Sequence, residues 1–392
     1  MSEPTPRRPW VPGLRTSDEG HRVTTFELFF DLVYVFAFTQ VSHLMAETHS
    51  ALGVLQALVV LGFLWWTWCA YSWLANQSPA DQGVLRAGMS VAMAAVFVAT
   101  LAIPEAFDDL PGGLVGSLVL VVAYAIVRLV HTTLYVLAAG DDAALRRQVL
   151  RTQVFALLPA LALLVVGALV GEPAQTWVWL GAFAWDVVLT WLTSRGGDWR
   201  LHSPAHWAER YGLVVILALG ESVVAIGVGA SHLPVSWPVV GGSVLSIALA
   251  LVLWWAYFLR SADEAEHRLA RLDGVERAGY ATVAYTYLHY VLIAGVVLAA
   301  LGVEEAMAHV DGAEPYGLFG ASALAGGVAA YLVGTAVLRR SAGGAWAWWR
   351  LAGTAATVAL VPVLARVPAL TALGLVVLVA YAWAVAEHGT GR

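Results

Sequence analysis

The sequence contains no lysine and a single cysteine, and few of its residues are charged. All 21 basic residues are arginine, and charged residues of both signs make up only 12% of the 392 residues. Soluble globular proteins carry about 25% charged residues, whereas 60% of this chain is hydrophobic, which excludes an ordinary soluble domain. The lone Cys69 excludes an intramolecular disulfide and a cysteine-cluster metal site. The net charge of −6 argues against a nucleic-acid partner.

Several functional signatures are also absent. The chain has no phosphate-binding loop, no HExxH zinc motif and no GxSxG nucleophile elbow. Its polar loops are too short to hold a soluble catalytic domain, and no nucleophile–base pair is evident. We therefore expect no enzymatic activity, no cofactor and no metal. Residues 1–22 lack the apolar core of a cleavable signal peptide, so the first hydrophobic segment should direct membrane insertion.

Long apolar runs dominate the rest of the chain. A helix needs about 20 apolar residues to cross a bilayer, and runs of this length without alternation are helical rather than barrel strands. The sequence therefore predicts an all-α, polytopic integral membrane protein with about 12 transmembrane helices. The predicted spans are residues 24–45, 51–74, 84–103, 113–138, 149–170, 174–194, 208–230, 237–260, 278–301, 316–338, 346–365 and 367–387. Residues 261–277 form the longest polar connection between two spans.

The distribution of arginine predicts the orientation. If the N-terminus is cytoplasmic, every arginine falls on the cytoplasmic side except Arg366, in an outer loop, and Arg128, inside a span. The opposite loops carry acidic residues instead. Since cytoplasmic loops are enriched in basic residues, we expect both termini in the cytoplasm. The tryptophan clusters at residues 65–73, 254–255 and 346–349 fit interfacial anchors at the same side.

Short matching segments indicate an internal duplication. Arg86-Ala87-Gly88 opens the third span and Arg277-Ala278-Gly279 the ninth, and ALLPALA at 156–162 matches ALVPVLA at 359–365. The chain is thus predicted to contain a cytoplasmic tail (1–22), a six-helix repeat (23–195), a cytoplasmic linker (196–207) and a second six-helix repeat (208–388). An even number of spans per repeat gives both repeats the same orientation, a 6+6 parallel arrangement with its pathway at the repeat interface.

The first span, residues 26–45, carries unusual polar groups. Its sequence FELFFDLVYVFAFTQVSHLM includes Glu27, Asp31 and Gln40. A charged side chain inside a membrane helix costs at least about 2.5–3.5 kcal/mol, so it needs a partner or water. Glu27 and Asp31 are four residues apart and share one helix face, which we expect to face the protein interior.

Three charges are predicted to lie at one depth in the first repeat. At about 1.5 Å rise per residue, Asp31, Arg128 and Asp186 lie about 10, 15 and 12 Å from the cytoplasmic edge. We expect Arg128 to bridge the two carboxylates, because unpaired charges would be costly there. The cluster is either a static polar lock or part of a transport pathway.

The second repeat has a different acidic residue. Glu221 lies near the bilayer midplane, twelve residues after Glu209, and is flanked by Gly220 and Ser222. Glycines in this span allow either close helix approach or a local break that exposes carbonyl groups to an ion. Glu221 is a candidate proton or cation site; the alternative is a protonated carboxyl in a helix contact.

Histidines are weaker candidates. His289 lies at a similar depth on a tyrosine-rich face, which is more often packing than a pore lining. His202 and His206 have helical i, i+4 spacing, but Pro204 between them argues against a metal site, and we expect solvated loop residues.

Two segments resemble the bacterial low temperature requirement protein A (LtrA) family. They are ELFFDLVYVFAFTQ in the first span and AERYGL with the later LGES in the seventh. The resemblance implies a bacterial multi-pass inner-membrane protein, and the family name refers to growth in the cold. It marks as characteristic polar residues Glu27, Asp31, Gln40, Glu209, Arg210, Glu221 and Ser222. A looser similarity links the F-x-D at the first span to potassium channels of duplicated six-helix type, although the second half lacks that aspartate.

These features predict a secondary transporter or permease whose buried carboxylates bind a coupling ion or proton. One alternative is an ion channel, and another is a non-transporting membrane protein that responds to stress. The expected partners are the lipid bilayer, a small ion or small molecule, and a second copy of the chain in a homodimer. The residues expected in the pathway are Glu27, Asp31, Gln40, Arg128, Asp186, Glu209, Glu221, Ser222 and His289.

Overall fold

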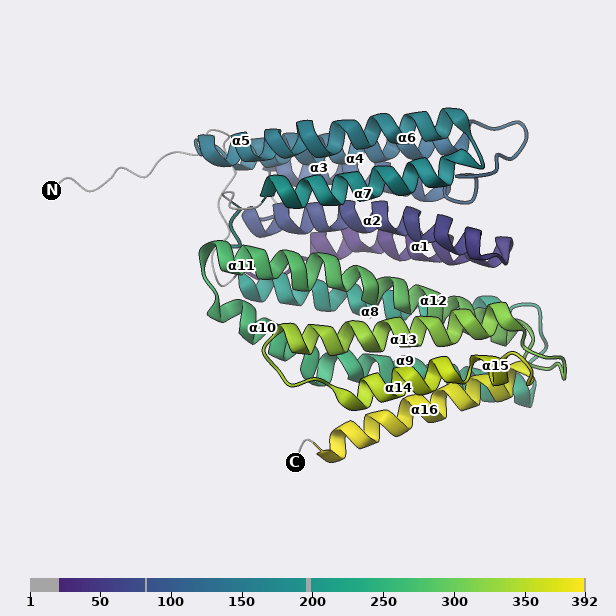
Figure 1. Ribbon diagram of the computed structural model, residues 1–392. Coiled ribbons are helices and arrows are strands. Elements are labelled where there is room, and N and C mark those ends of the chain that lie inside the picture. Colours follow the sequence, from purple (N-terminus) through teal and green to yellow (C-terminus); the bar gives the residue numbers. More distant parts are fainter. Residues whose placement is uncertain (1–20, 82, 195–198, 391–392) are drawn as a thin grey trace. The chain divides into compact units, whose positions relative to one another are not determined.

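The computed structural model of the chain describes residues 21–81, 83–194 and 199–390. Every regular element in these ranges is a helix, which confirms the all-α class (Figure 1). The predicted cytoplasmic tail, residues 1–22, lies almost wholly outside the described residues, and so do residues 195–198 at the start of the predicted linker.

Ten helical segments of the described residues are long and apolar enough to cross a membrane. They match ten of the predicted spans. The predicted span 174–194 forms helix α7 (Ala174–Ser194), but tryptophan, threonine and Asp186 lower its mean hydropathy. The predicted span 346–365 forms the shorter helices α14 (Trp348–Ala359) and α15 (Val361–Leu364). The total of 12 spans therefore stays a prediction.

Contacts group the chain into two compact units. The first comprises Met1–Tyr34, Gly62–Trp207 and Asp273–Ala278, and the second comprises Val35–Leu61, Ala208–Leu272 and Gly279–Arg392. The change of unit at residues 207–208 coincides with the predicted start of the second repeat. Helices α1 (Thr25–Thr48) and α2 (Ala51–Gln77), by contrast, each contribute one half to each unit. The predicted 6+6 duplication remains a prediction.

The first unit is built from antiparallel helix pairs. Helix α3 (Gly83–Leu101) packs on α4 (Gly116–Ala138). Helix α5 (Ala143–Thr152), the π-helix η1 (Gln153–Leu157) and α6 (Leu158–Val170) form one continuous rod beside α7 (Figure 1). The rod begins where the Asp142 carboxylate accepts hydrogen bonds from the backbone N–H groups of Ala144 and Leu145, a helix N-cap.

The second unit contains most of α8 (Pro204–Ala230) and the C-terminal helices. Helix α9 (Trp237–Ala256) packs on α16 (Ala369–Thr390), and α12 (Leu288–Ala308) packs on α13 (Leu318–Ser341). Glycines set the second contact. A Cβ at Gly327 would lie 2.3 Å from the backbone nitrogen of Ala299, and one at Gly302 2.5 Å from the backbone of Leu324. Small residues of this kind let membrane helices approach closely.

The predicted polar connection at 261–277 is mostly helical. Helix α9 continues through the π-helix η2 (Tyr257–Ser261) into α10 (Ala262–Arg271). The sequence ADEAEHRLAR explains this, because it contains strong helix formers, acids in the first turn and arginines in the last turn. After a short break, α11 (Gly274–Tyr280) and the π-helix η3 (Ala281–Tyr287) lead directly into α12.

Candidate functional site

Two of the three charges predicted to meet in the first unit form a direct ion pair. The guanidinium of Arg128 on α4 lies 3.0 Å from a carboxylate oxygen of Asp186 on α7, and both side chains are buried. Tyr124, one turn before Arg128, accepts a hydrogen bond from the same guanidinium nitrogen and donates to the same carboxylate. Thr190 donates to the other Asp186 oxygen. The pair therefore joins two helices of the first unit through a polar network.

Asp31 is not the second partner of Arg128, so the predicted three-residue bridge is wrong. Asp31 is fully buried on α1 and accepts a hydrogen bond of 2.8 Å from the indole N–H of Trp68 on α2. Equal depth along the membrane normal did not fix the rotation of each helix about its own axis. Asp31 faces α2, whereas the Arg128 guanidinium is directed to α7.

Glu27 stabilises the start of α1. Its carboxylate accepts a 2.7 Å hydrogen bond from the backbone N–H of Thr24, and the Thr24 hydroxyl accepts one from the Glu27 N–H. This reciprocal arrangement is a capping box, in which a threonine and a glutamate three residues later satisfy two helix-terminal donors. Glu27 is nevertheless fully buried, and its carboxylate has a further partner.

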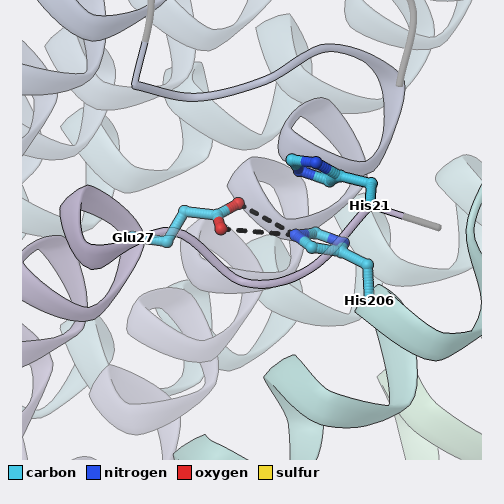
Figure 2. A group of neighbouring side chains, drawn as sticks. All are labelled: His21, Glu27 and His206. Carbon is cyan, nitrogen blue, oxygen red and sulfur yellow. Dashed lines mark hydrogen bonds and ion pairs between the residues drawn. The ribbon is translucent and has the colours of Figure 1, made fainter. Parts of the chain in front are cut away.

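That partner is His206, in the first turn of α8. Its Nε2 lies 3.0 and 3.3 Å from the two carboxylate oxygens of Glu27, and both side chains have no exposed surface (Figure 2). The His21 ring packs against the His206 ring with a 33° angle between their planes and centroids 4.7 Å apart. The expectation that His206 is a solvated loop residue is wrong. Ser203 and Pro204 begin a helix there, since serine is a preferred N-cap and proline is favoured at the first helical position.

Asn76 on α2 determines which nitrogen of His206 carries the proton. The Asn76 Oδ1 accepts from the backbone N–H groups of His202 and Ser203, so its Nδ2 must be the group that faces Ser203 O and His206 Nδ1. Nδ1 of His206 is therefore an acceptor, and the proton of the neutral ring lies on Nε2 and is donated to Glu27.

Burial and the positive charge of Arg200 lower the pKa of the neighbouring His202.

The donor types in this cluster are those of a zinc site. Ligand atoms of His21, Glu27 and His206 all lie within 4.8 Å of one another, and zinc takes imidazole nitrogens and carboxylate oxygens. A metal-binding histidine, however, donates its other N–H to an acceptor, whereas Asn76 offers a donor to His206. The surroundings of His206 thus favour a hydrogen-bonded cluster over a metal centre.

Glu221 is a buried acidic group of the second unit with one hydrogen-bond donor. Only 1% of its surface is exposed, and the Thr39 hydroxyl on α1 donates a 2.7 Å hydrogen bond to its carboxylate. Within the described ranges it makes no ion pair with any cationic side chain. A Cβ at the preceding Gly220 would have nothing within 4 Å, so no neighbouring helix packs closely on α8 at that position. The buried Ser222 follows it.

Helix α8 is continuous through Glu221, so the local break considered for this span does not occur. Close approach occurs instead at Gly229, where a Cβ would lie 2.5 Å from the carbonyl oxygen of Glu304 on α12. Glu304 also acts electrostatically on Glu221. Near the same end of α12, His49 forms a 2.9 Å pair with Glu305. Acidic groups thus continue from the surface toward the buried Glu221.

Other predicted residues have varied surroundings. Both ring nitrogens of His289 are used: Nε2 bonds the Tyr257 hydroxyl at 2.8 Å and Nδ1 the carbonyl of Ala284 at 2.9 Å. The ring stacks on Tyr285, with a 7° angle between the planes, so the geometry favours a packing role. Gln40 and Glu209 are half-buried.

Sequence reasoning missed a charged network in the second unit. Arg350 is 2% exposed, and its Nε lies 2.8 Å from Glu387, whose other oxygen pairs with Arg339 at 2.6 Å. Arg339 also contacts Glu264 at 3.1 Å. Arg350 and Glu387 could have been noticed as charged residues near the ends of predicted spans. The sequence does not indicate that they form a pair, because they are 37 residues apart.

Comparison with known proteins decides the family. The model of the "Bacterial low temperature requirement A protein (LtrA)" family matches residues 22–385. The chain belongs to the LtrA family. A protein of Rhizobium meliloti (strain 1021), described as uncharacterized, is 26% identical over 377 residues, which cover 91% of this chain and 87% of the relative. No solved structure matches the chain. LtrA membership and the ten long apolar helices together identify a multi-span membrane protein.

Proposed function

We propose that this LtrA protein is a secondary transporter or permease in which Glu221 binds and releases a coupling proton or cation. The observation that carries the proposal is the state of Glu221: it is buried, has a single hydrogen-bond donor and lacks a cationic partner in the described part of the chain. An ionised carboxylate is costly in such a place. The Glu221 carboxyl therefore needs either a proton or a bound cation. Exchange of the proton for a cation at this carboxyl couples ion binding to the transport of a substrate.

The contrast with Asp186 supports this assignment. Asp186 is equally buried, but Arg128 neutralises it and Tyr124 and Thr190 satisfy its oxygens. The charge of Asp186 is neutralised by a permanent arginine partner, so it does not require a mobile cation. The charge of an ionised Glu221 is not neutralised by any described side chain.

We also propose that the protein lies in the inner membrane of a bacterial cell, with both termini in the cytoplasm. Cytoplasmic loops are enriched in arginine and lysine, so the arginine-rich helix ends belong on that side. The acidic groups near Glu304 and Glu305 then face outward. A parallel duplication is supported by the matching segments ALLPALA at 156–162 and ALVPVLA at 359–365.

Reconstituted protein provides the test. In proteoliposomes loaded with a pH-sensitive dye, an imposed Na⁺, K⁺ or pH gradient should drive proton movement in the wild type. Glu221→Gln keeps the shape and the acceptor for Thr39 but cannot exchange a proton, so we expect at least a tenfold loss of flux. Asp263→Asn, an exposed carboxylate on α10, is the matched control and should behave as the wild type.

Infrared spectroscopy reads the same carboxyl without a substrate. A buried protonated carboxyl gives a C=O band that shifts on deuteration, and this band should disappear in Glu221→Gln and weaken when a coupling cation is added. Unchanged flux and an unchanged carboxyl band in Glu221→Gln would contradict the proposal. Flux that persists at channel-like rates without gradient coupling would favour the ion-channel alternative.

A further inference from the structure

A groove with apolar walls lies in the second unit between the end of α9 with η2 and the end of α16. Its volume is about 500 Å³, within the range of small-molecule sites, about 300–1,000 Å³. Its walls include Trp255, Leu259, Trp383 and Val385. Leu259 and Val385 are 57% and 53% exposed, so the apolar surface is open to the surroundings of the helices.

The charged groups at this groove do not cancel. Arg339 and Arg350 are balanced by Glu264 and Glu387 in the network already described. Arg260 of η2 also lines the groove. It is half-buried and makes no ion pair or hydrogen bond with the described residues. One positive charge therefore faces an apolar groove without a counterion from the protein.

The groove lies at the arginine- and tryptophan-rich helix ends of the second unit. Arg339 and Arg340 are in the last turn of α13, and Arg268 and Arg271 are in the last turn of α10. Trp254 and Trp255 are near the end of α9, and further tryptophans precede or begin α14. Arginine and tryptophan concentrate where membrane helices meet the headgroup layer. A ligand there meets apolar walls, the Arg260 guanidinium, His388 and the Arg350–Glu387 pair.

We propose that this groove binds an anionic phospholipid, with its phosphate at Arg260 and an acyl chain against Leu259 and Val385. A guanidinium pairs with phosphate in a bidentate manner, and basic pockets between transmembrane helices at this level suit anionic headgroups. A soluble anion would leave the apolar walls exposed, and a zwitterionic lipid would bring no net charge to balance Arg260. The site is independent of Glu221 and of the transport proposal.

Native mass spectrometry of the full chain tests the site. Protein in detergent is offered phosphatidylglycerol or phosphatidylcholine, and bound lipid is counted after mild activation. We expect the wild type to retain phosphatidylglycerol at least about tenfold more strongly than phosphatidylcholine, which corresponds to about 1.4 kcal/mol. Arg260→Gln should lose this preference, and Arg260→Lys should keep most of it. Arg268→Gln, an exposed arginine on α10 outside the groove, is the matched control and should match the wild type.

Two further arms separate the lipid from other ligands. Ala384→Trp fills the groove from α16 and leaves Arg260 intact, so it should also abolish selective retention of phosphatidylglycerol. Inorganic phosphate at millimolar concentration should not displace the lipid, because it makes no contact with the apolar walls. The proposal is overturned if Arg260→Gln or Ala384→Trp retains phosphatidylglycerol as the wild type does. It is also overturned if inorganic phosphate competes fully, which would indicate a site for a soluble anion.

Discussion

The ion pair between Arg128 and Asp186 joins α4 to α7 with both side chains buried. Breaking a buried pair by removing one partner leaves an uncompensated charge and typically costs about 3–5 kcal/mol. We expect Asp186→Asn to lower the free energy of unfolding by that amount, measured by denaturant titration in mixed micelles. The double variant Arg128→Met/Asp186→Leu removes both charges and should recover most of the loss. Wild-type stability of the single variant would show that water or lipid headgroups already screen the pair.

The proton on His206 gives a second prediction at the scale of single residues. Asn76→Asp should move the His206 proton to Nδ1, because a carboxylate oxygen accepts from Nδ1–H where the Asn76 amide donates, and the other oxygen still accepts from the backbone N–H groups of His202 and Ser203. The substitution also removes the hydrogen bond from Asn76 to the Ser203 carbonyl. Nε2 then becomes free to bind a metal beside Glu27 and His21, with the second-sphere carboxylate that zinc-binding histidines use. The expected result is stoichiometric Zn²⁺ bound to Asn76→Asp and not to the wild type, measured by elemental analysis after dialysis.

A control separates the site from adventitious zinc. Asn76→Asp combined with Glu27→Gln should lose the metal again, because a primary ligand is removed. Equal zinc content in the wild type and in Asn76→Asp would contradict this prediction.

Some of the buried side-chain contacts could be predicted from the sequence and others could not. Arg128 and Asp186 were predictable partners, because the rise per residue and the cost of a lone charge both pointed to contact. Asp31 was assigned the wrong partner, since depth alone does not fix which way a helix faces and Trp68 gives no charge signal. His206 was misjudged although Ser203-Pro204 is a helix-start pattern, and Asn76 has no feature that would single it out.

At the scale of elements, the contact between α12 and α13 depends on which glycine faces the neighbouring helix. A Cβ at Gly327 would meet the backbone of Ala299 at 2.3 Å, whereas one at Gly326 would have nothing within 4 Å. Gly327→Ala should force the helices apart and lower the melting temperature in detergent markedly. Gly326→Ala adds the same methyl group in open space and should be neutral or slightly stabilising, since alanine favours a helix by up to about 1 kcal/mol. Equal effects of the two substitutions would contradict this packing.

Helix existence was predictable, but several helix ends and irregularities were not. The long apolar runs predicted the ten described helices that are long and apolar enough to cross a membrane, because hydrophobic length is a strong signal. The predicted polar connection became α10 because hydropathy does not distinguish a polar helix from a polar loop. The three π-helices had no signal in the sequence. One of them places the Ala284 carbonyl five residues before His289, within reach of its Nδ1.

At the scale of the whole chain, the predicted repeats and the observed units agree near residue 208 and differ in the first two helices and at Asp273–Ala278. Halves of α1 and α2 belong to the second unit, which therefore contains the Thr39 that donates to Glu221. The predicted repeats depend on short sequence matches, whereas the units depend on where each part of a helix is packed. Helices of about 24–27 residues can satisfy both at once.

The arginine distribution predicts which side of the membrane each loop occupies. In a Cys69→Ala background, Glu314→Cys lies in the acidic loop before α13 and Arg271→Cys at the end of α10, and both positions are exposed. With the positive-inside arrangement, a membrane-impermeant maleimide should label position 314 in intact cells and position 271 only after the membrane is opened. The native Cys69 is buried, so the wild type should stay unlabelled in intact cells. The reverse pattern would place the acidic approach to Glu221 in the cytoplasm, and the proposed coupling ion would then have to enter from the opposite side.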